Sequence, residues 1–214
     1  MSQAASGRAS ARGAARRSPD LVSAATSLNS ANLADVLDRA LKFASLDSVL
    51  DKWLMPELER LGQAWADDEV TVAQEHFASA GVSRALGRAF DAVPDSLAPD
   101  VLVGLPEGSR HELGLQAFSV CLRRQRGGVV YLGSDVPVSD WESTARAIKP
   151  KGVVIGVPQC SEVAKAQEIV NRLTAEHPDL RVWVGGSLAS EVRGATQLPN
   201  RLAEAAEEVA TALR

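Results

Sequence analysis

The sequence predicts an N-terminal all-helical part followed by an α/β domain built on a parallel sheet. Apolar residues recur every three or four positions from residue 19 to residue 93, and this spacing places them on one side of each helix. From residue 99 to residue 214, short apolar runs alternate with helical segments, as in parallel sheets that helices cover on both faces. We therefore expect two domains, at residues 19–93 and 99–214.

Composition excludes several classes of protein. Of the 214 residues, 45% are hydrophobic and 23% are charged, which is ordinary for a soluble globular protein. The formal charge of −4 argues against a nucleic-acid binder that works through a broad basic face. No apolar run approaches the roughly 18 to 20 residues that span a bilayer, and no signal peptide is visible. We expect a cytoplasmic protein that does not contact a membrane.

Residues 1–18 predict a disordered basic tail. They are mostly Ala, Ser, Gly and Arg, and they include no acidic residue. Such a segment cannot bury enough apolar surface to fold alone. A basic tail could contact a nucleic acid or an acidic partner, but a solvated leader is the commoner case and the one we favour.

The helices of the first part have recognisable starts. A short helix is expected over residues 19–26, and Ser30 and Ser45 are candidate N-caps for the next two helices. Pro56 should kink the third helix or mark a helix start, because proline lacks the N–H of a helix interior. Together with the helix described next, these segments predict a four-helix bundle over residues 19–93.

The last helix of the bundle begins with a capping box. Thr71 and Gln74 have the spacing at which each side chain caps the backbone of the other residue. His76 lies at helical spacing from Val72 and Ala80, so we expect its side chain to point inward.

The second part reads as four strands separated by helices. Prolines and aspartates at residues 94–100 predict the linker, and a final helix is expected over residues 202–214. The loops that leave the carboxyl ends of parallel strands form the usual ligand surface. The predicted strands are 101–105, 129–132, 153–156 and 181–184, and their loops are 106–114, 133–137, 157–161 and 185–188.

The first of these loops holds His111 between a buried strand and a helix. An imidazole in such a loop can offer one ring nitrogen to a metal while a neighbour holds the other. The alternative is that His111 simply opens the helix. The fourth loop begins with Gly185-Gly186-Ser187, and paired glycines after a strand indicate a tight turn or a ligand against the backbone.

With the helical part in front, these loops resemble the cobalamin-binding domain family. That family has a Rossmann- or flavodoxin-like sheet, an Asp-x-His-x-x-Gly loop and a Gly-Gly after the fourth strand, and His111, Gly114, Gly185 and Gly186 match. The resemblance implies that His111 binds cobalt as the lower ligand and that the nucleotide tail threads between strands and helices. The other residues that it implies for the cofactor site are Ser109, Arg110, Val157, Gln159 and Ser187.

Two departures from that pattern concern the support of His111. Ser109 stands where the family has an acidic residue, and Val157 stands near the place of a serine. A carboxylate behind a ligating histidine raises its basicity, and a hydroxyl does so more weakly. We therefore expect a more labile bond between His111 and cobalt.

The helical part resembles the light-sensing adenosylcobalamin proteins of the CarH/LitR type. Trp65 is followed after nine residues by Glu75 and His76, as in the Trp-x9-Glu-His signature of that group. The resemblance implies that the bundle covers the upper face of the corrin and that these side chains surround the adenosyl group. The alternative is that Trp65 and His76 belong to the core.

Some features of that group are missing. Nothing before residue 19 could form a helix-turn-helix domain, so we expect no autonomous DNA binding. Ala66 replaces the histidine that captures cobalt after photolysis in some members. The chain also resembles the photocobilins, which hold a bilin such as biliverdin. Cys121 and Cys160 both lie in apolar stretches and in no attachment motif, so a bilin would be bound non-covalently.

Three functions are left open. We favour an adenosylcobalamin-dependent light sensor in which photolysis of the Co–C bond changes domain or oligomer contacts. It would act as a homo-oligomer, with a dimer favoured, on a protein partner that the sequence does not identify. A corrinoid protein that shuttles methyl groups is the first alternative, and a flavodoxin-like module without cobalamin is the second. No nucleophile–base pair or hydrolase metal spacing is visible, so we do not expect an enzyme.

Overall fold

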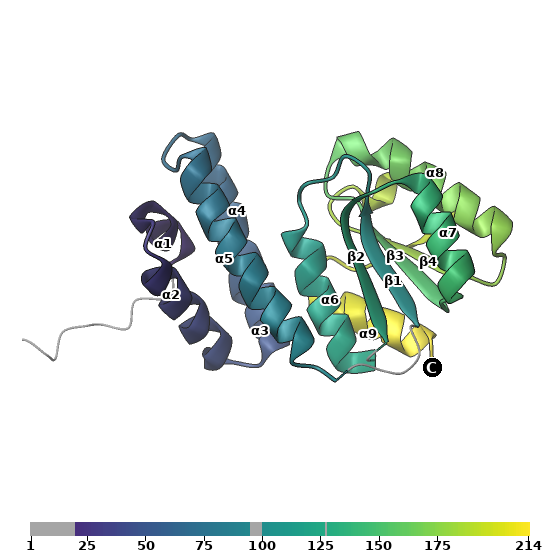
Figure 1. Cartoon of the computed structure of the whole chain (residues 1–214), viewed down its shortest axis with the longest axis horizontal. Coiled ribbons are helices and arrows are strands. Elements are labelled where there is room, and N and C mark those ends of the chain that lie inside the picture. Colours follow the sequence, from purple (N-terminus) through teal and green to yellow (C-terminus); the bar gives the residue numbers. More distant parts are fainter. Residues whose placement is uncertain (1–19, 95–99, 127) are drawn as a thin grey trace, which may run out of the picture.

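Helices form the first part of the chain and a parallel sheet with its own helices forms the second, as predicted (Figure 1). The computed structural model describes residues 20–94, 100–126 and 128–214. The tail predicted over residues 1–18 lies outside the described residues, and so does most of the predicted linker.

Within residues 20–94 the helical part packs as four rods, because α3, η1 and α4 follow one another without a break. The third rod contains a π-helical turn that ends at Leu54, and Pro56 follows as the second residue of α4, so Pro56 lies where a continuous helix changes type. The buried Glu57 accepts a hydrogen bond from the Leu21 N–H at 2.8 Å and ties this rod to the first helix. The helices are α1 (Leu21–Ser27), α2 (Ser30–Phe43), α3 (Leu46–Val49), η1 (Leu50–Leu54), α4 (Met55–Ala66) and α5 (Val72–Asp91).

Two of the predicted helix starts are confirmed and one is wrong. Thr71 and Gln74 form the capping box of α5, and Ser45 occupies the N-cap of α3. The N-cap of α2 is Asn29 rather than Ser30, because the Asn29 side-chain oxygen accepts bonds from two backbone N–H groups of the first turn at 2.9 and 3.1 Å.

The sheet has the strand order β2-β1-β3-β4-β5, and all four pairings are parallel. β2 continues four residues beyond its predicted end at 132, through a bulge at Gly133, whose φ is +83°. The fifth strand was not predicted, since two residues are too short to show a period. The strands are β1 (Val101–Pro106), β2 (Val129–Val136), β3 (Gly152–Gly156), β4 (Arg181–Gly185) and β5 (Thr196–Gln197).

Helices cover both faces of the sheet (Figure 1). Successive residues of a strand point to opposite faces, so Val103 packs with α6 (Leu113–Arg126) and α9 (Leu202–Ala212). Leu102 packs instead in a second core with α7 (Val138–Ile148) and α8 (Cys160–Glu176). The predicted parallel sheet with two covered faces is therefore confirmed.

The bundle rests on the α6 and α9 face and shares its apolar core. The Asp51 carboxylate, in η1, accepts the backbone N–H groups of Leu202 at 2.6 Å and Ala203 at 3.2 Å. A bundle residue thus caps the first turn of α9, where the N–H groups lack partners within the helix. This bond fixes the bundle against the sheet domain beside the carboxyl ends of the strands.

Candidate functional site

A cavity of about 410 Å³ lies at the carboxyl ends of the strands, where the predicted ligand loops meet. It is bounded by β1, β3 and β4, by α6 and α9, and by the first turns of α4. The predicted site residues that line it are His111, Gly114, Val157, Gly185, Gly186 and Ser187. Residues from loops up to 76 positions apart in the sequence therefore converge on one space, as the topology of a parallel sheet requires.

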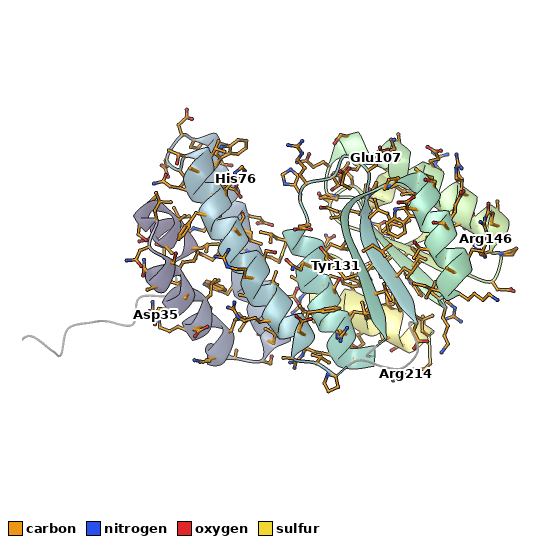
Figure 2. All side chains as sticks on the ribbon, viewed as in Figure 1. Asp35, His76, Glu107, Tyr131, Arg146 and Arg214 are labelled. Carbon is orange, nitrogen blue, oxygen red and sulfur yellow. The ribbon has the colours of Figure 1, made fainter. Side chains whose placement is uncertain are left out.

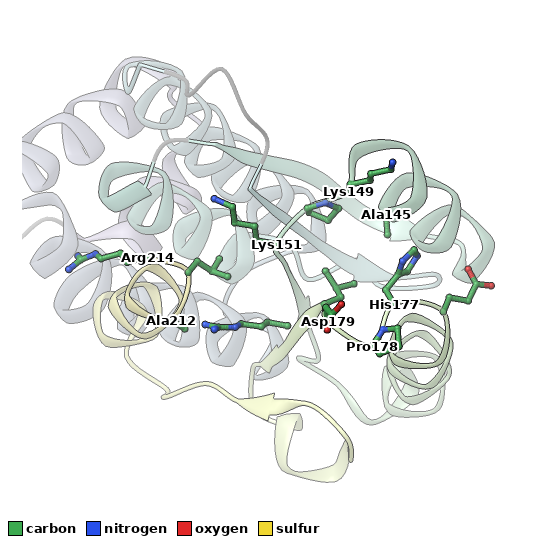
Figure 3. Close-up of a pocket in the computed structure, with 13 residues that line it drawn as sticks. Ala145, Lys149, Lys151, His177, Pro178, Asp179, Ala212 and Arg214 are labelled. Carbon is green, nitrogen blue, oxygen red and sulfur yellow. The ribbon is translucent and has the colours of Figure 1, made fainter.

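A larger hollow of about 720 Å³ lies at the opposite, amino edge of the sheet, where Lys149 and His177 line it (Figure 3). It is shallower and contains none of the predicted site residues. β3 and β4 begin at this edge, so their full length separates it from the His111 loop. We place the candidate site in the smaller cavity.

His111 is exposed and lines the cavity, so it stands where the cavity opens to solvent. Its Nε2 atom lies 2.7 Å from the Nε2 atom of Gln159, at the start of α8. The helix α6 begins at Leu113, two residues after His111. The observed hydrogen bond of the imidazole is thus made to the third loop of the sheet rather than to the helix that follows it.

Ser109 does not support His111 in the way we expected. Its side chain is buried, with 1% exposed, and its hydroxyl has no hydrogen-bond partner within the described part of the chain. The partner that holds His111 is Gln159. The next residue, Arg110, is exposed and does not line the cavity.

The glycines give the cavity walls without side chains. A Cβ atom on Gly186 would lie 2.9 Å from the Val157 carbonyl oxygen, and Gly186 has a φ of +105°, which side chains disfavour. A Cβ atom on Gly185 would lie 3.6 Å from Leu198, which is ordinary contact, so Gly185 leaves room in the cavity itself. A Cβ atom on Gly114 would lie 3.5 Å from the Met55 methyl group, which is also ordinary contact.

Backbone bonds hold the third and fourth loops together beneath the cavity. The Val157 N–H donates to the Gly185 carbonyl at 2.7 Å, and the Leu188 N–H donates back to Val157 at 3.0 Å. The Ser187 hydroxyl donates to the Pro158 carbonyl at 2.8 Å. Val157, at the predicted serine position, is fully buried and packs in the core on the α7 and α8 side. These bonds make the two loops one rigid floor.

An ion pair holds the first loop, residues 106–114, against α8. Lys165 in α8 contacts the Glu107 carboxylate at 2.6 Å, and this bond raises the pKa of Lys165 above its ordinary value. The Asp135 carboxylate accepts the Gly108 N–H at 2.7 Å. The His111 loop is thereby tied to both β2 and α8. Both ties are exposed, so they position the loop more than they stabilise the fold.

The cavity is not lined by Trp65, Glu75 or His76, which lie on α4 and α5 of the bundle. Trp65 is 50% exposed, so it is not a core residue. Our expectation that His76 points inward is wrong, because its side chain is 74% exposed. The buried face of α5 is formed instead by Ala78, Gly81, Val82, Ala85 and Leu86. Figure 2 shows His76 on the bundle and Glu107 on the sheet domain, both toward the top of the view.

Several residues of the site could not be found in the sequence. Met55 and Glu59 line the cavity from α4, and Leu198 and Asn200 line it from the segment before α9. Nothing local marks them, because each reaches the cavity only through the packing of distant elements. Of the two cysteines in apolar stretches of the sequence, Cys121 is buried and Cys160 is exposed at the start of α8.

The donor set suits a metal that brings most of its own ligands. Within residues 20–94, 100–126 and 128–214, no group of three or more His, Cys, Asp or Glu side chains could hold a metal ion. A cobalt ion inside a macrocycle needs only one protein nitrogen, and the Nε2 atom of His111 lies where the cavity opens. The glycine-walled cavity leaves space for an extended tail. The residues present therefore fit a corrinoid.

Among the described helices, none combines the length and the apolar character that crossing a membrane requires.

Comparison with known proteins agrees with this geometry. Two sections of the chain, residues 19–89 and 99–209, match families that are both described as the B12 binding domain. The HTH-type transcriptional repressor CarA of Myxococcus xanthus is 30% identical over 179 residues, which are 81% of this chain and 59% of CarA. CarH, a second repressor of that description from the same organism, is 30% identical over 79% of this chain and 57% of its own length. The chain spans less than two thirds of the length of these relatives.

A solved structure shares the whole fold. The monomethylamine corrinoid protein of Methanosarcina barkeri superimposes with a TM-score of 0.71 over 90% of this chain and 96% of its own chain. The two sequences are 18% identical, so the match concerns the fold.

Proposed function

We propose a light-sensing function on the premise that this chain belongs to the B12-binding domain family and binds cobalamin. Specifically, the protein would hold adenosylcobalamin and change its domain or oligomer contacts when light is absorbed. When bound, adenosylcobalamin supplies a cobalt–carbon bond that visible light cleaves. The observation that carries the cobalamin-binding part of the proposal is the convergence of His111 and the loop glycines on one cavity at the sheet edge.

The residues of the sheet domain would hold the cofactor from below. His111 would offer its Nε2 atom to cobalt, and Gly185 and Gly186 would let the nucleotide tail lie against the backbone. The hydrogen bonds between the third and fourth loops keep this floor in place before binding. His111 and the glycines therefore bind and orient the cofactor without a change in the sheet.

The light-sensing part of the proposal rests on Trp65. Burying an indole is favourable, so an indole that is half exposed at the end of α4 has apolar surface to offer to a ligand. Glu75, hydrogen-bonded to Ser79, and the exposed His76 supply polar groups on the neighbouring helix. Together these residues would exclude water from the upper face and contact the sugar and base of the adenosyl group.

A corrinoid protein that carries methyl groups is the second candidate, favoured by the fold shared with the Methanosarcina barkeri protein. Such a carrier must present its upper face to partner enzymes, whereas Trp65 would cover that face. A preference for methylcobalamin, unchanged in Trp65→Ala, would favour the carrier.

The test is the visible spectrum of the full chain with adenosylcobalamin, recorded in the dark and after green illumination. Fast conversion that slows in Trp65→Ala supports the sensor, and binding without fast conversion refutes it. The Ala66 side chain carries no nitrogen, so the illuminated form should lack a second histidine ligand from this position. An added far-red band after supply of biliverdin would reveal a second, bilin chromophore.

The proposal also covers how the protein passes on the light signal. We infer a cytoplasmic signalling protein without enzymatic activity that forms a homo-oligomer, most simply a dimer, and acts on a protein partner. Light scattering of the dark and illuminated holoprotein would show a change in mass if the oligomer carries the signal. An unchanged mass would assign the signal to domain contacts within one chain.

A further inference from the structure

We propose that Gln159 sets the tautomer of His111 and competes with cobalt for its Nε2 atom. The inference rests on the proposed function for the identity of the metal and on a hydrogen bond of this chain for the rest. Gln159 would then be a positioning residue that prepares the ligand and delays its bond to cobalt.

The tautomer follows from the atoms that face each other. The side-chain nitrogen of Gln159 lies 2.7 Å from Nε2 of His111. An amide nitrogen can only donate, so Nε2 must accept, and the proton of the neutral ring must be on Nδ1. A metal needs the same form of the ring, with a free electron pair on Nε2. Gln159 therefore stabilises the tautomer that cobalt requires.

The same geometry makes the two bonds mutually exclusive. Nε2 has one electron pair in the plane of the ring, and that pair cannot point at the Gln159 amide and at cobalt together. The amide must leave before cobalt binds. The histidine is thus in the correct form but covered, so the rate of ligation depends on the release of Gln159.

For this release the end of the Gln159 side chain has to leave both His111 and the capping box that it shares with Glu162 at the start of α8. Its backbone N–H donates to Glu162 at 3.0 Å, and Glu162 is buried, with 2% exposed. The preceding Pro158 carbonyl accepts the Ser187 hydroxyl at 2.8 Å. The Gln159 side chain itself is exposed. A rotation of this side chain within a fixed loop is therefore sufficient.

The experiment compares the full chain with two variants, Q159L and Q159E. Leucine removes the donor at similar size, whereas glutamate keeps the size but can only accept when ionised. Long-range ¹⁵N–¹H NMR of the protein purified without corrinoid reads the His111 tautomer. Stopped-flow mixing with adenosylcobalamin in the dark then reads the rate of histidine ligation, and nitrogen splitting in the EPR spectrum of the cob(II)alamin form confirms the ligand.

We expect a single Nδ1–H tautomer in the wild type, a mixture of tautomers in Q159L, and the Nε2–H tautomer in Q159E. Loss of one exposed hydrogen bond should raise the ligation rate of Q159L by about three- to tenfold. In Q159E, His111 should bind cobalt more slowly than in the wild type, because the Nε2 atom of His111 then carries a proton.

Two results would overturn the proposal: an Nε2–H tautomer in the wild type, or a Q159L variant with unchanged tautomer and unchanged rate. If no variant binds adenosylcobalamin, the proposed function is refuted instead. The tautomer measurement needs no corrinoid, so it would still decide whether Gln159 sets the form of His111.

Discussion

Substitution by alanine should have different effects at the two neighbouring glycines of the fourth loop: Gly186→Ala should lower the stability of the fold, and Gly185→Ala should weaken cobalamin binding. Gly186→Ala places a methyl group 2.9 Å from the Val157 carbonyl oxygen and 3.2 Å from the Pro158 nitrogen, and these backbone atoms belong to the rigid floor of the cavity. Its φ of +105° is also unfavourable for alanine. Gly185→Ala meets only the Leu198 side chain, at 3.6 Å, and its methyl group enters the space of the cavity.

The magnitudes follow from these contacts. Backbone strain in Gly186→Ala costs about 1–3 kcal/mol, and the overpacked methyl group costs a further ~1 kcal/mol or more, so the free energy of unfolding should fall by about 2–4 kcal/mol. Gly185→Ala should change that free energy by less than about 1 kcal/mol. Its methyl group should instead weaken cobalamin binding by about 1–3 kcal/mol, or roughly five- to a hundredfold in Kd.

Urea unfolding of the protein without cofactor and titration with adenosylcobalamin in the dark measure the two effects separately. Gly186→Ala should lower the unfolding midpoint, and Gly185→Ala should raise Kd while the midpoint stays in place. Equal stability of the two variants would refute the assignment of Gly186 to a position that only glycine fits. Wild-type affinity in Gly185→Ala would remove this wall from the binding site.

Three more outcomes test other parts of the structure. Asp51→Ala should cost about 0.5–2 kcal/mol of stability and speed amide exchange in the first turn of α9, because it removes the cap of that helix, and unchanged exchange there would contradict the cap. In the folded protein a thiol reagent should modify Cys160 quickly and Cys121 only after denaturation, so a Cys160→Ser variant that still reacts quickly would contradict the burial of Cys121. Burial raises the pKa of the Cys121 thiol and of the Tyr131 phenol. The unfolded chain loses both protons at lower pH than the folded one, so stability should be complete below the ordinary thiol pKa of 9.0 and fall as the pH rises above it, and unfolding at pH 8 and 10 with Cys121→Ala as a control measures this loss.

Three features of the structure differ from the predictions for physical reasons. His76 shares helical spacing with Val72 and Ala80, but all three of these residues are exposed in the structure. Ser30 and Asn29 are both good N-caps, and only the backbone decides which one precedes the first helical residue. Gly133 favours a turn in the sequence, but in the sheet it forms a bulge within β2, and the strand therefore continues to Val136.

The sequence by itself determined the order of the helices and of the first four strands, the loop that holds His111 and the glycines at the end of β4, because these depend on local period and on residues that a single loop requires. Only the tertiary structure decided what surrounds them. The cavity walls from α4, the cap that Asp51 gives to α9 and the bond between Gln159 and His111 each join residues 48 to 152 positions apart. Such contacts depend on how packed elements fit together in space, and no local pattern in the chain encodes that fit.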